Sequence, residues 1–77
     1  MTDVLFPRLS EQQSGSEGVL ATWFVSDGDT VREEQLIAEV QVDKAAADVT
    51  APASGVITLL VRENDAVVQG TPIARVT

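Results

Sequence analysis

The chain has 77 residues, enough for one small domain (residues 1–77) and too few for a second. A hydrophobic content of 44% predicts a folded domain, and a net charge of −7 argues against nucleic acid or an anionic membrane as a partner, since both are bound through positive charge. The sequence has no histidine and no cysteine, which removes the usual general base, the commonest metal ligand and any disulfide, so we expect neither an autonomous enzyme nor a metal site.

No apolar run approaches the roughly 18 residues of a membrane-spanning helix. The N-terminal "MTD" also lacks the basic and apolar regions of a secretory signal. Together with the missing cysteine, these features predict a reduced intracellular compartment.

The first predicted strand begins a sequence repeat. "DVLFP" reappears as "DVTAP", and "GVLATWFV" is followed later by the shorter "GVITLLV". "VSDGDTVREEQLIAEV" then aligns with "VRENDAVVQGTPIARV" at a constant offset of 36, with six identical positions. The chain is therefore interpreted as two copies of one unit, residues 3–40 and 48–76, joined by residues 41–47.

Turns and loops are predicted between the strands of each copy. The polar run "SEQQSGSEG" (Ser10–Gly18) is expected to be a flexible surface loop. "SDGD" and "REND" are expected to be turns, because their Asn, Asp and Gly residues tolerate positive φ. Pro7, Pro52 and Pro72 fall near strand ends, where a missing amide donor matters least.

The apolar pattern predicts the fold class. Four large apolar residues are expected to fill a core between two sheets: Trp23, Phe24, Leu59 and Leu60. Short strands at regular spacing predict an all-β fold, a flattened β-barrel or sandwich of two four-stranded sheets with internal pseudo-two-fold symmetry.

The junction between the copies has two interpretations. Residues 32–48 are rich in good helix formers, which favours a helix. The repeat favours a strand, because Leu36 corresponds to Pro72, and proline inside a helix costs roughly 3 kcal/mol. A two-residue turn at Asp43-Lys44 would then make a hairpin. The predicted pairs are Val42 with Ala45, Val40 with Ala47 and Ala38 with Val49 on an apolar face, and Gln41 with Ala46, Glu39 with Asp48 and Ile37 with Thr50 on the other.

Lys44 is the only lysine in the chain, whose other basic residues are all arginines. A single exposed lysine is usually a solvated charge. Lysine, unlike arginine, has an amine that can be acylated. This lysine lies at the tip of the predicted hairpin, and the small residues Ala45, Ala46 and Ala47 after it leave room for a modifying enzyme. Lys44 is therefore a candidate modification site.

Four motifs carry a family resemblance: "FPRL" near the start, "GDTV" before the hairpin, "DKA" at its tip and "APASG" after it. In this order and spacing, residues 3–77 resemble a lipoyl domain of the acyltransferase (E2) component of a 2-oxo-acid dehydrogenase complex. The resemblance implies lipoate as a covalent cofactor in amide linkage on Lys44. It also implies that Asp43 and Ala45 are flanking recognition residues for the modification, although turn geometry explains Asp43 equally well.

The chain departs from the family pattern at several positions. Gln41 stands three residues before the lysine, where the family usually has an acid, and Val42 stands two before, where it often has threonine. Glu34 replaces a glycine that the second copy keeps as Gly70. The loop Ser10–Gly18 is about two residues longer than usual, and in the family this loop helps the cognate dehydrogenase to select its domain.

The resemblance implies a carrier that has no catalytic residues of its own. The lipoyl group on Lys44 would accept an acyl group from a thiamin diphosphate-dependent dehydrogenase (E1) and deliver it to the E2 catalytic core for transfer to coenzyme A. Dihydrolipoamide dehydrogenase (E3) would reoxidise it, and a lipoate ligase or lipoyl transferase would attach it. The implied domain is a monomer in the bacterial cytoplasm or the mitochondrial matrix.

Three other assignments were weighed against this one. A biotin carboxyl carrier domain shares the fold and would carry biotin on Lys44, but that family places methionine on both sides of its lysine. A glycine-cleavage H protein is also lipoylated but is considerably longer. An unmodified lipoyl-like module of an export adaptor would have a structural role only, which leaves the single lysine without a purpose.

Overall fold

Eight β-strands form the secondary structure of the computed structural model, which describes residues 1–8, 17–42 and 45–77. They are β1 (Thr2–Leu5), β2 (Glu17–Trp23), β3 (Thr30–Val31), β4 (Leu36–Val42), β5 (Ala45–Thr50), β6 (Gly55–Leu59), β7 (Ala66–Val68) and β8 (Pro72–Val76). Within these described ranges, no helix is long and apolar enough to cross a membrane.

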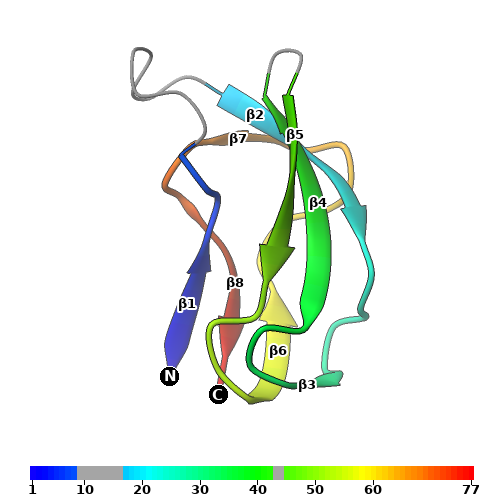
Figure 1. Ribbon diagram of the computed structural model, residues 1–77, viewed down its shortest axis with the longest axis vertical. Helices are drawn as coiled ribbons and strands as arrows, with labels where there is room; N and C mark the ends of the chain where they lie inside the picture. The colour runs from blue at the N-terminus through cyan, green and yellow to red at the C-terminus, as the bar shows by residue number, and fades with distance from the viewer. Residues whose placement is uncertain (9–16, 43–44) are drawn as a thin grey trace.

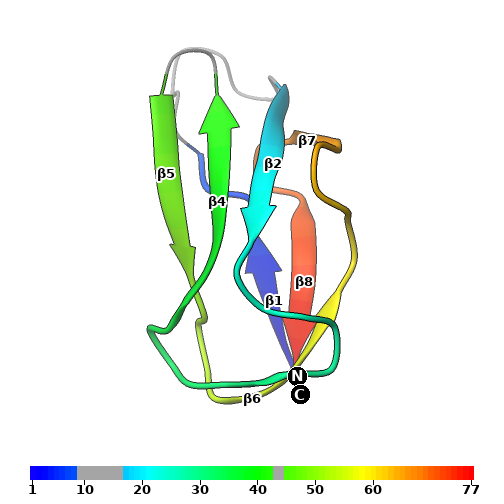
Figure 2. The same cartoon turned by 90° about the vertical axis from the view of Figure 1, so that its right-hand side faces the viewer.

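Two four-stranded antiparallel sheets enclose one core (Figures 1 and 2). One sheet has the strand order β1-β8-β6-β3 and the other has the order β5-β4-β2-β7. Exchanging each strand for the one four places away in the chain converts the first order into the second. The sheets confirm the predicted all-β fold, and each sheet takes two strands from each copy of the repeat.

The turns after β2 and β6 are equivalent in detail. In the first turn, Asp29 Oδ2 accepts a hydrogen bond from the Ser26 N–H at 2.8 Å. In the second, Asp65 Oδ2 accepts one from the Arg62 N–H at 2.9 Å. These Asp side chains fix each turn locally, as Asp commonly does.

A carboxylate in each of these turns also accepts a backbone hydrogen bond from a strand of the other copy. Asp27 Oδ1 accepts a hydrogen bond from the Leu59 N–H at 2.9 Å. At the equivalent place, Glu63 Oε2 accepts one from the Trp23 N–H, also at 2.9 Å. The longer glutamate thus replaces aspartate without loss of the contact.

Positive φ angles also recur at the offset of 36. Gly28 (φ 90°) corresponds to Asn64 (φ 72°), and Gly70 (φ 89°) corresponds to Glu34 (φ 71°). Glycine and asparagine adopt this left-handed conformation readily, whereas glutamate does so at a cost. Glu34 is therefore the one strained member of the four.

The hairpin strands confirm strand over helix for the junction, and five of the six predicted pairs are observed. The sixth is wrong: Leu36, and not Ile37, pairs with Thr50. A β-bulge between Leu36 and Ala38 shifts the register, so that Ile37 and Ala38 are both buried although they are adjacent. The equivalent pairing of β1 with β8 has the same irregularity.

Two of the four residues predicted to fill the core are exposed. Phe24 is 52% exposed and Leu60 is 46% exposed, whereas Trp23 and Leu59 are half-buried and pack against the core. Neighbouring side chains of an extended chain point to opposite sides, so a residue that follows an inward Trp23 or Leu59 points outward. The prediction for Phe24 and Leu60 was therefore wrong.

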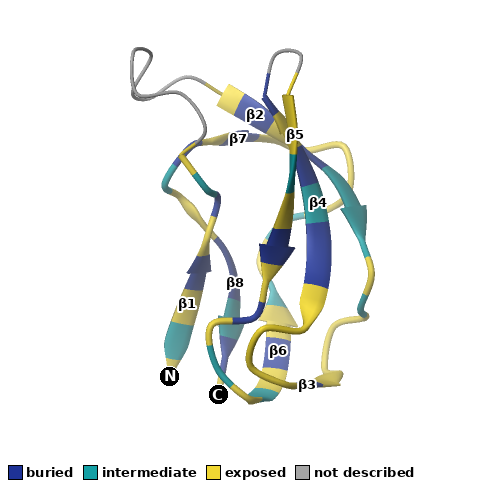
Figure 3. Ribbon diagram, in the orientation of Figure 1, coloured by how far each residue is buried: buried dark blue, intermediate teal, exposed yellow. Residues whose placement is uncertain are grey.

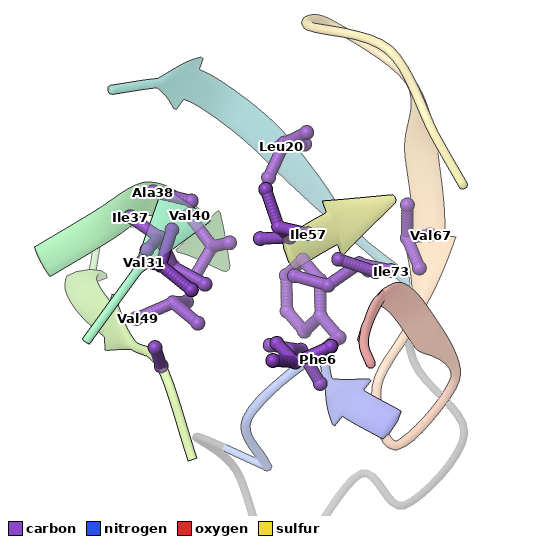
Figure 4. Close-up of a cluster of buried hydrophobic side chains, with 14 of the residues drawn as sticks. Phe6, Leu20, Val31, Ile37, Ala38, Val40, Val49, Ile57, Val67 and Ile73 are labelled. Atoms are coloured by element: carbon purple, nitrogen blue, oxygen red, sulfur yellow. The ribbon is translucent and has the colours of Figure 1, made fainter. Parts of the chain in front are cut away.

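The centre of the core consists of aliphatic side chains and one phenylalanine from both sheets (Figure 4). The largest fully buried side chains are Phe6, Leu20, Ile37, Ile57, Ile73, Val31 and Val40. More buried and less buried positions alternate along β4 from Ala38 to Val42 and along β5 from Ala46 to Thr50 (Figure 3). Burial of one such side chain contributes about 1.5–3 kcal/mol.

Replacing Glu34 by glycine should stabilise the domain. The Glu34→Gly variant removes the cost of a left-handed glutamate, and we expect a gain of about 0.5–1 kcal/mol in the free energy of unfolding, measured by urea titration. The hydrogen bond from the backbone N–H of residue 34 to Ala51 O, 2.7 Å long, does not depend on the side chain. The adjacent exposed Glu33→Gly variant is the control and should lose stability; a lower urea midpoint for Glu34→Gly would contradict the prediction.

Candidate functional site

The candidate site lies where β4 ends at Val42 and β5 begins at Ala45, at the end of the molecule opposite the two chain termini (Figures 1 and 2). The predicted modification site, Lys44, and its neighbour Asp43 lie outside the described residues, so their assignment stays a prediction. The described part of the site is formed by the strand ends on either side of them.

The described strand ends carry both buried and exposed side chains. Val42 is 6% exposed and points into the core, whereas Gln41 is exposed. On β5, Ala45 and Ala46 are exposed and Ala47 is half-buried. Among the described exposed positions at these strand ends, Gln41 has a long side chain and Ala45 and Ala46 have short ones.

Strand β4 gives the site a rigid base because it is hydrogen-bonded on both sides. It pairs with β5 from Leu36 to Val42 and with β2 through Gln41, which lies opposite Val19. Val40 and Val42 anchor the same strand in the core. Long-range pairing on both edges and burial of one face leave β4 little freedom to move.

Gly18 on β2 is required by close packing at this end. A Cβ added to Gly18 would overlap Cζ of Phe6 and lie 2.8 Å from the carbonyl O of Gln41. The prediction of a surface loop over Ser10–Gly18 was wrong at its last two residues. Glu17 and Gly18 belong to β2, and Gly18 is buried. The remainder of that loop is outside the described residues.

Arg8 is a contact that the sequence reasoning missed. An added Cβ on Gly70 would lie 3.1 Å from Nε and 3.2 Å from Nη2 of Arg8, so the guanidinium group lies directly against the glycine backbone. The only hint in the sequence was that the two copies differ here, with Gly70 in the second copy and Glu34 at the equivalent position of the first. The partner of the glycine could not be identified from that difference.

The outer side of the hairpin is acidic. Glu39 lies opposite Asp48, which confirms the predicted like-charge pair. The equivalent positions on β1 and β8 carry Asp3 and Arg75, which form a salt bridge with 3.1 Å between Nε and Oδ1. The same place in the fold thus holds an ion pair at one end and two carboxylates near the candidate site.

Comparisons with known proteins agree with this geometry. The family model of biotin and lipoyl attachment domains, described as "Biotin-requiring enzyme", matches residues 2–76. The solution structure of the lipoyl domain of the 2-oxoglutarate dehydrogenase complex from Azotobacter vinelandii superposes with a TM-score of 0.79. That match is 31% identical and covers 100% of this chain and 96% of the other.

Full-length relatives are similar over a shorter stretch. The dihydrolipoyllysine-residue acetyltransferase components of the pyruvate dehydrogenase complexes of Staphylococcus aureus and Staphylococcus epidermidis are each 38% identical over 61 residues. The matched stretch covers 78% of this chain and 14% of each relative, so the chain spans only a small part of their length.

These matches and the paired four-stranded sheets define the class of the protein as a carrier domain of the biotin/lipoyl attachment family. Within that family, the chain belongs to the lipoyl domains of 2-oxo-acid dehydrogenase E2 components.

Substitution of Gly18 should disturb this end of the fold. The Gly18→Ala variant forces Phe6 or the β4 backbone to shift, and overpacking of this kind costs about 1–3 kcal/mol of unfolding free energy. Urea titration followed by tryptophan fluorescence of Trp23 would measure the loss. Val19→Ala, at the exposed neighbouring position, should cost less than about 1 kcal/mol; equal losses in the two variants would contradict the packing argument.

Proposed function

We propose that this chain is a lipoyl carrier domain that bears lipoate in amide linkage on the ε-amine of Lys44. The main support is the position of the only lysine in the sequence, directly between the paired strands β4 and β5 of a lipoyl-domain fold. A lysine amine is the group that an activated carboxylate can acylate under mild conditions.

The described residues fit such a group. Ala45 and Ala46 are small and exposed, so they leave the approach to the modification site open. Val42 is buried and fixes the end of β4 to the core. The residues of this chain would therefore hold and present the attachment point, and Asp43 and Ala45 would be read by the modifying enzyme.

Lipoate, when bound, supplies a dithiolane that accepts and releases an acyl group together with two electrons. The chain itself needs no nucleophile or general base for this role, which is consistent with a sequence without cysteine or histidine. Its contribution is to carry the group between active sites, because tethering raises the effective concentration at each of them.

The proposed partners follow from this role. They are a lipoate ligase or lipoyl transferase, the thiamin diphosphate-dependent E1, the acyltransferase core of E2, and the E3 dehydrogenase. The relatives come from complexes of pyruvate and 2-oxoglutarate dehydrogenase, so a short 2-oxo acid is the proposed substrate class of the whole assembly. The relatives are bacterial, which favours the bacterial cytoplasm over the mitochondrial matrix.

Intact-mass spectrometry tests the carrier function. The chain, incubated with a lipoate ligase, ATP and lipoate, should gain the mass of one lipoyl group, and the Lys44→Arg variant should gain none. Arginine keeps the positive charge but has no amine of suitable reactivity, so the variant isolates the chemistry of the lysine.

Two outcomes would contradict the proposal. The first is an unmodified wild-type chain under conditions that lipoylate a known lipoyl domain. The second is modification by a biotin ligase in place of the lipoate ligase, which would assign the chain to the biotin carriers.

A further inference from the structure

We propose that the outer face of the hairpin sheet is the docking surface for the enzyme that acylates Lys44, and that Glu39 and Asp48 bind basic side chains of that enzyme. We call this surface the hairpin face and define it by Val19, Glu39, Gln41, Ala46 and Asp48. The inference rests on the proposed function and adds the chemistry by which one partner is recognised.

Strand pairing places these five residues side by side. Gln41 lies opposite Ala46 on β5 and opposite Val19 on β2, and Glu39 lies opposite Asp48 in the next outward row. Val40, between Glu39 and Gln41, is buried, and Ala47, between Ala46 and Asp48, is half-buried, so the five side chains share the outer side of the sheet. Figure 3 shows this alternation along β4 and β5.

The two carboxylates of the hairpin face repel each other. Like charges directly opposite in an antiparallel pair destabilise a sheet. Within the described part of the chain, the salt bridge observed is that of Asp3 with Arg75, which lies on the other sheet. Asp48 is exposed and Glu39 is half-buried, and among residues 1–8, 17–42 and 45–77 no cation forms an ion pair with either of them.

The internal repeat shows that the fold does not require this repulsion. Asp48 is equivalent to Asp3 and Glu39 is equivalent to Arg75, and the second pair forms an ion pair in the same strand geometry. An arginine at position 39 would be compatible with the fold by this comparison. Two carboxylates side by side next to the uncharged residues Val19, Gln41 and Ala46 complement a partner surface that carries arginine or lysine.

The position of the pair favours the modifying enzyme among the proposed partners. Glu39 is three residues from the end of β4, or about 10 Å along the strand. An enzyme that acylates an unmodified lysine must approach to within the length of a four-carbon side chain, so its surface must meet the strands on either side. E1 and E3 act on an arm that the lipoyl chain has lengthened, and they can approach from farther away.

Substitutions that give the Glu39–Asp48 pair the charges of the Arg75–Asp3 pair, and the reverse, test the inference. Glu39→Arg should create an ion pair with Asp48 and raise Tm by about 2–5 °C. It should also lower kcat/KM for lipoylation by lipoate ligase, ATP and lipoate about tenfold at low salt, with a smaller effect at 0.3 M NaCl. Glu39→Gln keeps the size of the side chain and should lower the rate less, which guards against a folding defect.

Arg75→Glu is the matched control. It should create the like-charge pair on the other sheet and lower Tm, yet leave the lipoylation rate unchanged. The double variant Glu39→Arg/Arg75→Glu keeps the net charge of the chain, so a rate as low as that of Glu39→Arg alone would exclude an effect of total charge.

The remaining outcomes separate this inference from the proposed function. Equal lipoylation rates for wild type and Glu39→Arg would overturn the docking face and leave the carrier function intact. Normal lipoylation with slower acylation by E1 would overturn the assignment to the modifying enzyme. Failure of the wild-type chain to be lipoylated at all would overturn the carrier function together with the docking face.

Discussion

Neither copy of the repeat can complete its sheets without the other, and this constraint determines the rest of the structure. β1 and β3 of the first copy flank β8 and β6 of the second, while β5 and β7 of the second flank β4 and β2 of the first. The turn carboxylates of Asp27 and Glu63 then bind backbone amides of the opposite copy. Residues far apart in the chain therefore hold both sheets together.

The repeat in the sequence was the strongest predictor of the fold. Alignment of Leu36 with Pro72 favoured a strand over the helix that local propensity suggested, and alternation then predicted five of the six hairpin pairs correctly. The bulge beside Ile37 was not predictable, because an extra residue in one strand leaves no mark in an apolar run. Phe24 and Leu60 were misjudged for a related reason: size and hydrophobicity do not reveal on which side of the sheet a residue lies.

The position of the candidate site stays a prediction, and the sequence predicted only part of the described structure around it. The single lysine in the unduplicated segment and the small residues after it were visible in the sequence. The contact of Arg8 with Gly70 and the packing of Gly18 against Phe6 were not, because both join segments whose separation depends on the tertiary fold. The pairing of Glu39 with Asp48 was predicted from the sequence. That the equivalent positions, Asp3 and Arg75, form a salt bridge was seen only in the structure.

The pseudo-symmetry also relates the hairpin to the chain ends. Gln41 and Ala46 correspond to Thr77 and Met1, so the two termini occupy the place that a second hairpin tip would occupy in a circularly permuted or cyclised molecule. The hairpin strand ends and the two termini therefore lie at opposite ends of the molecule (Figures 1 and 2). A polypeptide fused to either terminus would therefore begin at the end of the molecule opposite the candidate site.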